Sequence, residues 1–186
     1  MNVVDYAQIE RLYPHADDAM TARIHRAVDM VNQAARPREV QASFKVDETL
    51  SMRGFVPAGK DIKKHLSGSE IVIVGACTLG ADVDRLIERT KIIDLATAYL
   101  VDQAASYAVE NLAERTCRDT KAAMAADGYR CTTRYSCGYG DFDLGCQADL
   151  LRLAGADKAL GIQVNEGGMM YPTKTITYLV GVSQNQ

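Results

Sequence analysis

A long periodic segment, from residue 92 to about 126, constrains the fold of this chain more than any other feature. Apolar side chains recur in it at three- and four-residue spacing, which is the period of an α-helix with one buried stripe. The predicted buried face consists of Ile93, Ala96, Leu100, Ala104, Ala108 and Leu112. Gly128 follows directly, as is common where a helix ends. The small residues in the stripe allow another element to approach closely, so we expect this helix to be central to the fold.

Length and composition predict that the rest of the chain packs into a single unit with this helix. The chain has 186 residues, of which 47% are hydrophobic and 24% charged, and these values exclude the disordered and collagen-like classes. We therefore predict one domain over residues 1–186. Its N-terminal part, residues 1–37, is predicted to be helical because apolar residues recur at helical spacing from about 16 to 35.

The remaining patterns predict strands and short helices. Residues 40–48 alternate between apolar and polar side chains, as in a half-buried strand, and residues 70–77 form a continuous β-branched run. A short helix is expected at 61–66, a strand at 129–135, a helix at about 146–154 and two strands within 166–182. This order predicts an α+β fold with a partly antiparallel sheet and a long central helix.

The turn after the strand at 70–77 excludes one common function. Gly75 and Gly80 have the spacing of a phosphate-binding loop, and a helix follows them. However, Ala81 and Asp82 occupy the positions where that loop needs a lysine and a hydroxyl side chain. We therefore predict no nucleoside triphosphate site. Thr78 and Gly80 are interpreted as a helix cap and a tight turn.

Charge and hydropathy exclude two classes of partner. The formal net charge is −3, which argues against nucleic acid binding. The longest apolar stretch, residues 71–81, is too short for a membrane-spanning helix. The first ten residues contain Asp5 and Glu10 and no apolar run, so no secretory signal is predicted. These observations predict a soluble, cytoplasmic protein with no membrane partner.

Five cysteines, at positions 77, 117, 131, 137 and 146, show no CxxC pair and are odd in number. This usage is typical of reduced thiols in a cytosolic protein. Cys131, Cys137 and Cys146 are close in sequence, which leaves open a metal or redox site, although no zinc spacing is present. The three histidines are scattered, so we predict no histidine-based catalytic site and no metal site.

The segment RYSCGYGDFDLGC, residues 134–146, is the strongest candidate for ligand binding. Arg134 offers a planar fork for a carboxylate, and Tyr135 and Tyr139 offer flat faces and hydroxyl groups. Gly138 and Gly140 allow backbone amides to approach a ligand closely. A turn that carries surface aromatic residues would have the same composition, so both interpretations stand at this point.

Three motifs in order resemble the activation domain of cobalamin-dependent methionine synthase. They are the strand followed by T-L-G-x-x-V-D-R-L from Thr78, the run R-x-x-x-G-Y from Arg134, and M-x-P-x-K-T-x-T from Met170. The resemblance covers about residues 40–183 and is strongest to short stand-alone relatives of that domain. It implies an α+β fold with a curved, mostly antiparallel sheet and a long central helix.

The resemblance also implies a function. Domains of this family bind S-adenosylmethionine and position its methyl group for reductive methylation of cob(II)alamin. The cobalamin would be carried by a partner, either the cobalamin-binding modules of methionine synthase or another corrinoid protein, and the electron would come from a flavodoxin-like donor. The chain would therefore be an accessory component and not a complete enzyme, with no catalytic acid or base of its own.

The site residues follow from the motifs. Arg134 would bind the carboxylate of the methionine moiety, Gly138 would allow close backbone approach, and Tyr139 would border the ligand where it meets the corrin. Tyr135 would line the same loop. Glu110, in the run AVENLAER, resembles a family residue that accepts a hydrogen bond from the ammonium group or the ribose of the ligand.

One departure from the family pattern keeps two other hypotheses open. The family has a proline before the Gly-Tyr pair, and this chain has Cys137. The replacement of proline by cysteine removes a fixed φ and adds a thiol beside the predicted ligand. The chain could therefore be a cysteine-based metal or redox protein, or a non-catalytic interaction module on the same fold.

Overall fold

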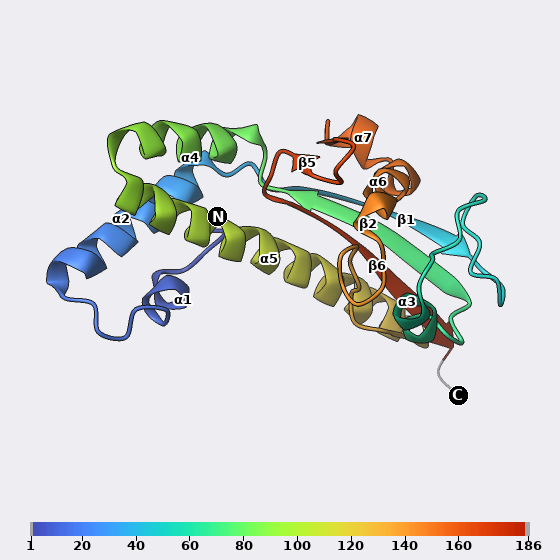
Figure 1. Cartoon of the computed structure of the whole chain (residues 1–186). Helices are drawn as coiled ribbons and strands as arrows, with labels where there is room; N and C mark the ends of the chain where they lie inside the picture. The colour runs from blue at the N-terminus through green and yellow to red at the C-terminus, as the bar shows by residue number, and fades with distance from the viewer. Residues whose placement is uncertain (1, 185–186) are drawn as a thin grey trace. The chain divides into compact units, whose positions relative to one another are not determined.

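A computed structural model describes residues 2–184 and divides them into two compact units. The first unit contains the chain up to Arg38, Thr78–Leu112 and Pro172–Thr175. The second contains Glu39–Cys77, Ala113–Tyr171 and the chain from Ile176 onward. The helices and strands are drawn in Figure 1. No helix among the described residues is both long and apolar enough to span a bilayer.

The helices are α1 (Tyr6–Glu10), α2 (Asp18–Ala34), α3 (Lys60–His65), α4 (Ala81–Ile93), α5 (Leu95–Ala126), α6 (Gln147–Ala154) and α7 (Ala156–Ala159), with a 3₁₀ turn η1 (Leu144–Cys146). They include all of the expected helical segments, with α1 and α7 in addition. The strands are β1 (Arg38–Lys45), β2 (Ile71–Thr78), β3 (Tyr129–Cys131), β4 (Gln163–Val164), β5 (Met170–Tyr171) and β6 (Thr175–Gln184). The mixed α+β class and the long helix are therefore confirmed.

The main sheet has the strand order β1-β2-β6-β3, and its pairings are antiparallel. The Val46 N–H donates to the Glu70 carbonyl, and the Glu70 N–H donates to the Val182 carbonyl. The Tyr129–Gln184 pair begins the β3–β6 ladder. β4 and β5 form a separate two-stranded sheet. The antiparallel sheet that the sequence predicts is thus present.

Nearly all of the main sheet belongs to the second unit and is covered on both faces. One face packs apolar side chains of β2 against α3, α6, α7 and the loop before η1; its core includes Val72, Val74, Ala76, Ile62, Phe142 and Leu150. The other face carries the core Ile73, Tyr178, Val180 and Val182, against which Cys117 and Met124 of α5 pack. This double coverage explains why residues 70–77 are continuously apolar.

The first unit is mostly helical. The apolar stripe of α2 buries Ile24, Ala27, Val28 and Val31, and that of α4 buries Val83, Leu86 and Ile87. α2 packs against both α1 and α4. The Tyr13 hydroxyl donates to Gln103 Oε1 at 2.6 Å, which ties the segment after α1 to α5. The helical character predicted for residues 1–37 is therefore present.

The long helix differs from its prediction at its beginning. Asp94, with φ −152° and ψ 102°, interrupts the helical path between α4 and α5. Its carboxylate accepts hydrogen bonds from the Ala96 and Thr97 backbone N–H groups, and these bonds start a new helix. Ile93 and Ala96 consequently do not belong to the buried stripe, contrary to expectation, and both are exposed. Leu100, Ala104, Ala108 and Leu112 are buried as predicted.

The predicted strand 129–135 is also shorter than expected. β3 ends at Cys131, because the Thr132 hydroxyl accepts the Gly181 N–H that a regular ladder would give to a backbone carbonyl. Pairing resumes only as an isolated bridge between Tyr135 and Leu179. Thr78 likewise does not cap α4: Gly80 is the N-cap residue, and the Thr78 hydroxyl accepts the Gly80 N–H.

Candidate functional site

The glycine-rich loop after β3 begins at the Tyr135–Leu179 bridge, where each residue donates its N–H to the other's carbonyl. Beyond it the chain turns back on itself, with the Gly138 N–H donating to the Phe142 carbonyl at 2.8 Å and the Phe142 N–H donating to the Tyr139 carbonyl at 3.0 Å. Gly138 has φ +86°, a conformation that favours glycine. The loop is therefore a hydrogen-bonded turn with a defined shape.

Contacts to α3 hold this loop in place. The Asp141 carboxylate accepts the Lys60 N–H at 2.6 Å and the Asp61 N–H at 3.0 Å, and these bonds lower the pKa of Asp141. Gly140 has φ +53°, and a Cβ there would overlap Asp61 Oδ2 and the Tyr135 hydroxyl, so the position favours glycine. The first residues of α3 thus hold the loop in position.

The two tyrosines of the motif lie together. Their ring centroids are 6.2 Å apart, and the Tyr135 hydroxyl donates to the Tyr139 carbonyl at 3.3 Å. The Tyr135 ring also lies 5.0 Å from the ring of His65, whose Nε2 is 2.7 Å from the Thr133 carbonyl oxygen. Tyr135 is therefore committed to supporting the loop. Tyr139 is 57% exposed and presents its ring to solvent.

Arg134 and Tyr135 have different surroundings. Tyr135 packs into the core shared with α3 and α6, whereas Arg134 acts on thiols of the other face. Burial raises the pKa of the Cys77 thiol to about 12, and the nearby Arg134 guanidinium partly opposes that rise. Arg134 acts in the same way on Cys117 of α5. Arg134 is therefore close to the face that α5 covers, and the residue is half-buried.

A buried polar group on the α5 face was not identified from the sequence. Tyr178 is fully buried, and its hydroxyl accepts a hydrogen bond from Gln41 Nε2 at 2.8 Å. Gln41 also bonds the Thr120 hydroxyl of α5 at 2.9 Å. A Cβ at Gly75 would overlap the Tyr178 ring, so the glycine allows the ring to lie across the strand. Alternation alone predicts Tyr178 as a strand residue and gives no signal for Gln41.

Glu110 differs in position from the other four candidates. It is exposed on the part of α5 that belongs to the first unit, whereas Arg134, Tyr135, Gly138 and Tyr139 belong to the second. The structure therefore brings Tyr135 and Tyr139 into contact, places Arg134 close to the other sheet face, and leaves Glu110 in a separate unit.

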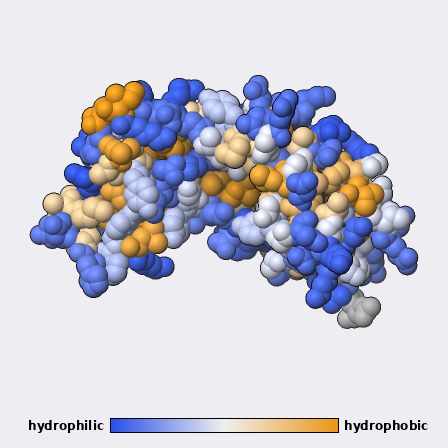
Figure 2. Space-filling model, in the orientation of Figure 1, coloured by the Kyte–Doolittle hydropathy of each residue, from blue (hydrophilic) through white to orange (hydrophobic). Residues whose placement is uncertain are grey.

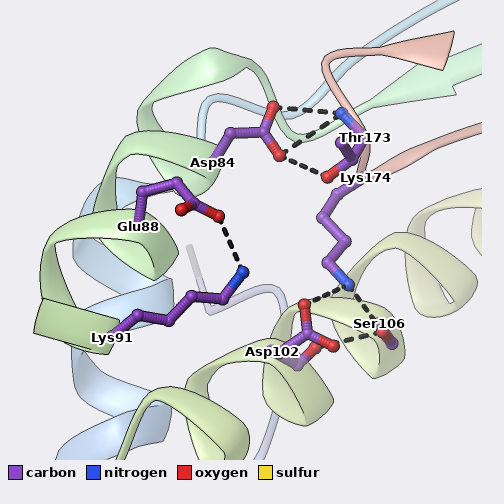
Figure 3. A network of polar contacts seen from close by, with 7 residues as sticks. All are labelled: Asp84, Glu88, Lys91, Asp102, Ser106, Thr173 and Lys174. Carbon is purple, nitrogen blue, oxygen red and sulfur yellow. Dashed lines mark hydrogen bonds and ion pairs between the residues drawn. The ribbon is translucent and has the colours of Figure 1, made fainter. Parts of the chain in front are cut away.

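Two of the three sequence motifs meet in the first unit. The Asp84 carboxylate, from V-D-R-L, accepts the Thr173 N–H at 3.0 Å and also its hydroxyl. Lys174, from M-x-P-x-K-T-x-T, forms an ion pair with Asp102 at 2.9 Å and donates to the Ser106 hydroxyl at 2.9 Å (Figure 3). These contacts join α4, α5 and the segment that leads into β6. The motif residues here have a structural role.

The cysteines do not form a ligand cluster. No group of three or more His, Cys, Asp or Glu side chains within residues 2–184 is placed to hold a metal ion. Cys137 is buried in the apolar core, and burial raises its pKa to about 12, with a further contribution from Cys146. A thiol with such a pKa stays protonated at neutral pH and is a poor nucleophile.

Comparison with known proteins gives a match at the level of structure only. No protein-family model matches the chain, and no curated protein matches it in sequence. A crystal structure of the MetH reactivation domain bound to AdoHcy matches with a TM-score of 0.66 and 15% identity. The match covers 100% of this chain and 75% of that domain chain. The two proteins share a fold over the whole of this chain.

Proposed function

We propose that this protein binds S-adenosylmethionine and positions its methyl group for transfer to a corrinoid carried by a partner protein. The observation that carries the proposal is the shared fold with a reactivation domain that holds AdoHcy, over the full length of this chain. The R-x-x-x-G-Y run supports it, because it provides a cation, a glycine with positive φ and an exposed aromatic ring within six residues. AdoHcy, or S-adenosylhomocysteine, is the product that remains when S-adenosylmethionine has given up its methyl group.

The chemistry requires positioning more than proton transfer. S-adenosylmethionine carries its methyl group on a positive sulfonium, and a one-electron-reduced cobalt of the partner would accept that methyl while the C–S bonding pair returns to sulfur. No proton moves in this transfer, so the protein needs no general base. His25 and His65 are engaged with Glu10 Oε1 and the Thr133 carbonyl, respectively, which agrees with structural roles.

Arg134 is the proposed carboxylate ligand. Its guanidinium can form two parallel hydrogen bonds to the amino-acid carboxylate of the ligand. Its partial burial beside Cys77 and Cys117 supports this role, because a charge-assisted bond is stronger where water is partly excluded. Lysine at this position would keep the charge but lose the planar fork.

The loop residues have complementary proposed roles. A Cβ at Gly138 would meet only Leu144 Cδ1, at 3.6 Å, so the backbone there is open to a ligand. Tyr139 would border the ligand on the side where the corrin approaches. Tyr135 would act as a positioning residue, since its hydroxyl and ring hold the Tyr139 segment. Glu110 would attract the cationic ligand and would accept a hydrogen bond from its ammonium group or ribose.

The proposed partners follow from the same reaction. The corrinoid would be held by the cobalamin-binding modules of methionine synthase or by another corrinoid protein, and a flavodoxin-like protein would supply the electron. All five cysteines are free thiols, which agrees with a reducing, cytoplasmic compartment. No observation of the structure favours a thiol-based metal or redox function as a second candidate.

Calorimetric titration of the whole chain with S-adenosylmethionine and with S-adenosylhomocysteine tests the ligand. We expect saturable binding that Arg134→Ala reduces by about 30-fold or more, the loss of a charge-assisted bidentate contact of about 2 kcal/mol. Arg130→Ala is the matched control, since Arg130 is an exposed arginine on β3 that bonds Ser183 Oγ. Tyr139→Ala should also weaken binding while leaving the fold intact.

The charge of Glu110 is tested by ligand preference. Glu110→Gln should reduce the preference for S-adenosylmethionine over S-adenosylhomocysteine, which lacks the sulfonium charge. Glu114→Gln, an exposed carboxylate further along α5, is the control. Absence of binding to either ligand, with and without an added corrinoid protein, would refute the proposed function. Equal affinities in Arg134→Ala and the wild type would refute the loop assignment alone.

A further inference from the structure

The corner between α4 and α5 exposes an unusual run of large apolar side chains. Ile92 is 87% exposed, Ile93 85%, Leu95 72% and Tyr99 60%. Figure 2 shows apolar side chains at this turn, surrounded by hydrophilic surface. Scattered apolar residues on a surface need no explanation, whereas large exposed apolar side chains that lie together are typical of interaction sites.

The corner is built on a fixed backbone. Asp94 Oδ1 accepts the Ala96 N–H at 3.0 Å, and Oδ2 accepts the Thr97 hydroxyl at 2.6 Å. The Asp94 N–H in turn donates to the Thr90 carbonyl at 2.8 Å, which closes the last turn of α4. The two isoleucines therefore protrude from the end of an ordered helix.

An apolar groove lies next to this corner in the same unit. It has a volume of about 580 Å³ and is lined by Tyr13, Met20, Arg23, Leu95, Ala96, Tyr99 and Leu100. The ring of Tyr13 is held in place by the hydrogen bond from its hydroxyl to Gln103. Leu95 and Tyr99 are part of both the exposed patch and the groove. The same surface thus carries a protrusion and a hollow.

We propose that this surface is the interface of a two-fold homodimer, in which Ile92 and Ile93 of each copy insert into the groove of the other. A second copy is the occupant that satisfies both features at once, because a two-fold axis through the patch pairs each protrusion with a groove. The two features are neighbours, so the contact closes on itself and does not propagate into a filament.

The charges of the patch support a self-complementary contact. Arg23 lines the groove, and Asp94 lies in the corner between Ile93 and Leu95. Arg23 is close enough to Asp94 for its charge to help lower the pKa of that carboxyl, after the larger effect of the Thr97 hydroxyl. Lys91, next to Ile92, is paired with Glu88 at 2.7 Å. The charges at the patch therefore include both signs, so it can face a rotated copy of itself with opposite charges opposed.

Sedimentation equilibrium of the whole chain tests the proposal. We expect the wild type to be a dimer and the double variant Ile92→Glu/Ile93→Glu to be a monomer. The loss of a central apolar contact should raise the dimer dissociation constant well over 30-fold, or about 2 kcal/mol. Met169→Glu is the matched control, because Met169 is 61% exposed on the second unit and should leave the dimer unchanged. Far-UV circular dichroism checks that each variant is folded.

A tryptophan probe locates the interface independently. The chain contains no tryptophan, so Tyr99→Trp introduces a single reporter at the groove. Its emission should shift to longer wavelength as the protein is diluted and the dimer dissociates. The shift should be absent when Ile92→Glu/Ile93→Glu is combined with the probe.

Three results would overturn the proposal. The first is a wild-type chain that stays monomeric at about 1 mM, where even a weak specific contact would be populated. The second is a dimer that the isoleucine substitutions do not weaken, which would place the interface elsewhere. The third is a monomer whose patch is required only for binding another protein, which would make that protein the occupant.

Discussion

The two units of this protein hold their segments together by different means. The second unit buries apolar side chains on both faces of its sheet, with Tyr178 at the centre of one of them. The first unit buries the apolar stripes of its helices and in addition uses polar side chains that bond to backbone groups distant in sequence. Asn32 Oδ1, for example, accepts the Val3 and Val4 N–H groups, and Asp84 accepts the Thr173 N–H.

This difference explains where each kind of sequence signal is found. A sheet buried on both faces needs apolar volume, which many residues can supply, and its pattern is visible as periodicity. A junction between distant segments needs one donor matched to one acceptor, and each such pair uses particular residues. The V-D-R-L and M-x-P-x-K-T-x-T motifs stand at such a junction. The comparison predicts that substitutions in the two units fail for different reasons.

The largest effect is expected in the core of the second unit. Tyr178→Ala should lower the free energy of unfolding by about 3–5 kcal/mol, because it removes a fully buried aromatic side chain and leaves a cavity. Tyr178→Phe should cost only about 1–2 kcal/mol, through the lost hydrogen bond from Gln41. Urea unfolding followed by circular dichroism measures both. A similar cost for Tyr139→Ala, an exposed tyrosine, would contradict the assignment of the core.

A pH effect is expected from two buried thiols of the same unit. Burial raises the pKa of Cys77 and of Cys137 to about 12 in the folded state. The unfolded chain releases these protons near pH 8.5, so it binds fewer protons than the native state above that value. The stabilisation is present below about pH 8.5 and is lost as pH rises toward 12, by about 1.4 kcal/mol per thiol per pH unit.

Urea unfolding at pH 8 and pH 10 measures this loss. The double variant Cys77→Ala/Cys137→Ala should be less stable at pH 8 but should show a smaller decrease between the two pH values. Equal decreases in the variant and the wild type would show that other groups cause the alkaline effect. The same variant separates the thiols from Tyr178, whose pKa burial also raises.

The smallest effect is expected at the polar junction of the first unit. Asp84→Ala should lower the free energy of unfolding by about 1–3 kcal/mol, because the Thr173 N–H and hydroxyl would lose their charged, buried acceptor. Glu88→Ala, one turn further along α4, removes an exposed carboxylate paired with Lys91 and should cost at most about 0.5 kcal/mol (Figure 3). Thermal unfolding measures both variants. Equal losses of stability in Asp84→Ala and Glu88→Ala would show that burial does not strengthen the contacts of the junction.

Most of the fold was accessible from the sequence, because periodicity reports burial directly. The stripes of α2 and α4 and the alternation in β1 were predicted and are present. The start of α5 was predicted wrongly, since the pattern continues through Ile93 and Ala96 while Asp94 turns the chain. A local capping preference overrode the hydrophobic period there, and the period itself gave no sign of it.

The candidate site was accessible only in part. The motif residues could be named because their types suit carboxylate and aromatic recognition, and they remain predictions for the titrations above. Pairings between distant residues were not accessible: Gln41 with Tyr178, and Asp84 with Thr173. A hydrogen bond across so many residues leaves no local pattern in the chain.

By itself the sequence determined the class of fold, the order of its elements and the apolar faces that form the core, because burial is encoded in local spacing. Only the tertiary structure decided which face of the sheet Arg134 lies close to, which motifs meet around Lys174 and which isoleucines remain exposed. These outcomes depend on strand register and on a single cap at Asp94. The register and the cap depend on contacts between individual atoms of packed segments, and the hydrophobic pattern of the sequence does not encode such contacts.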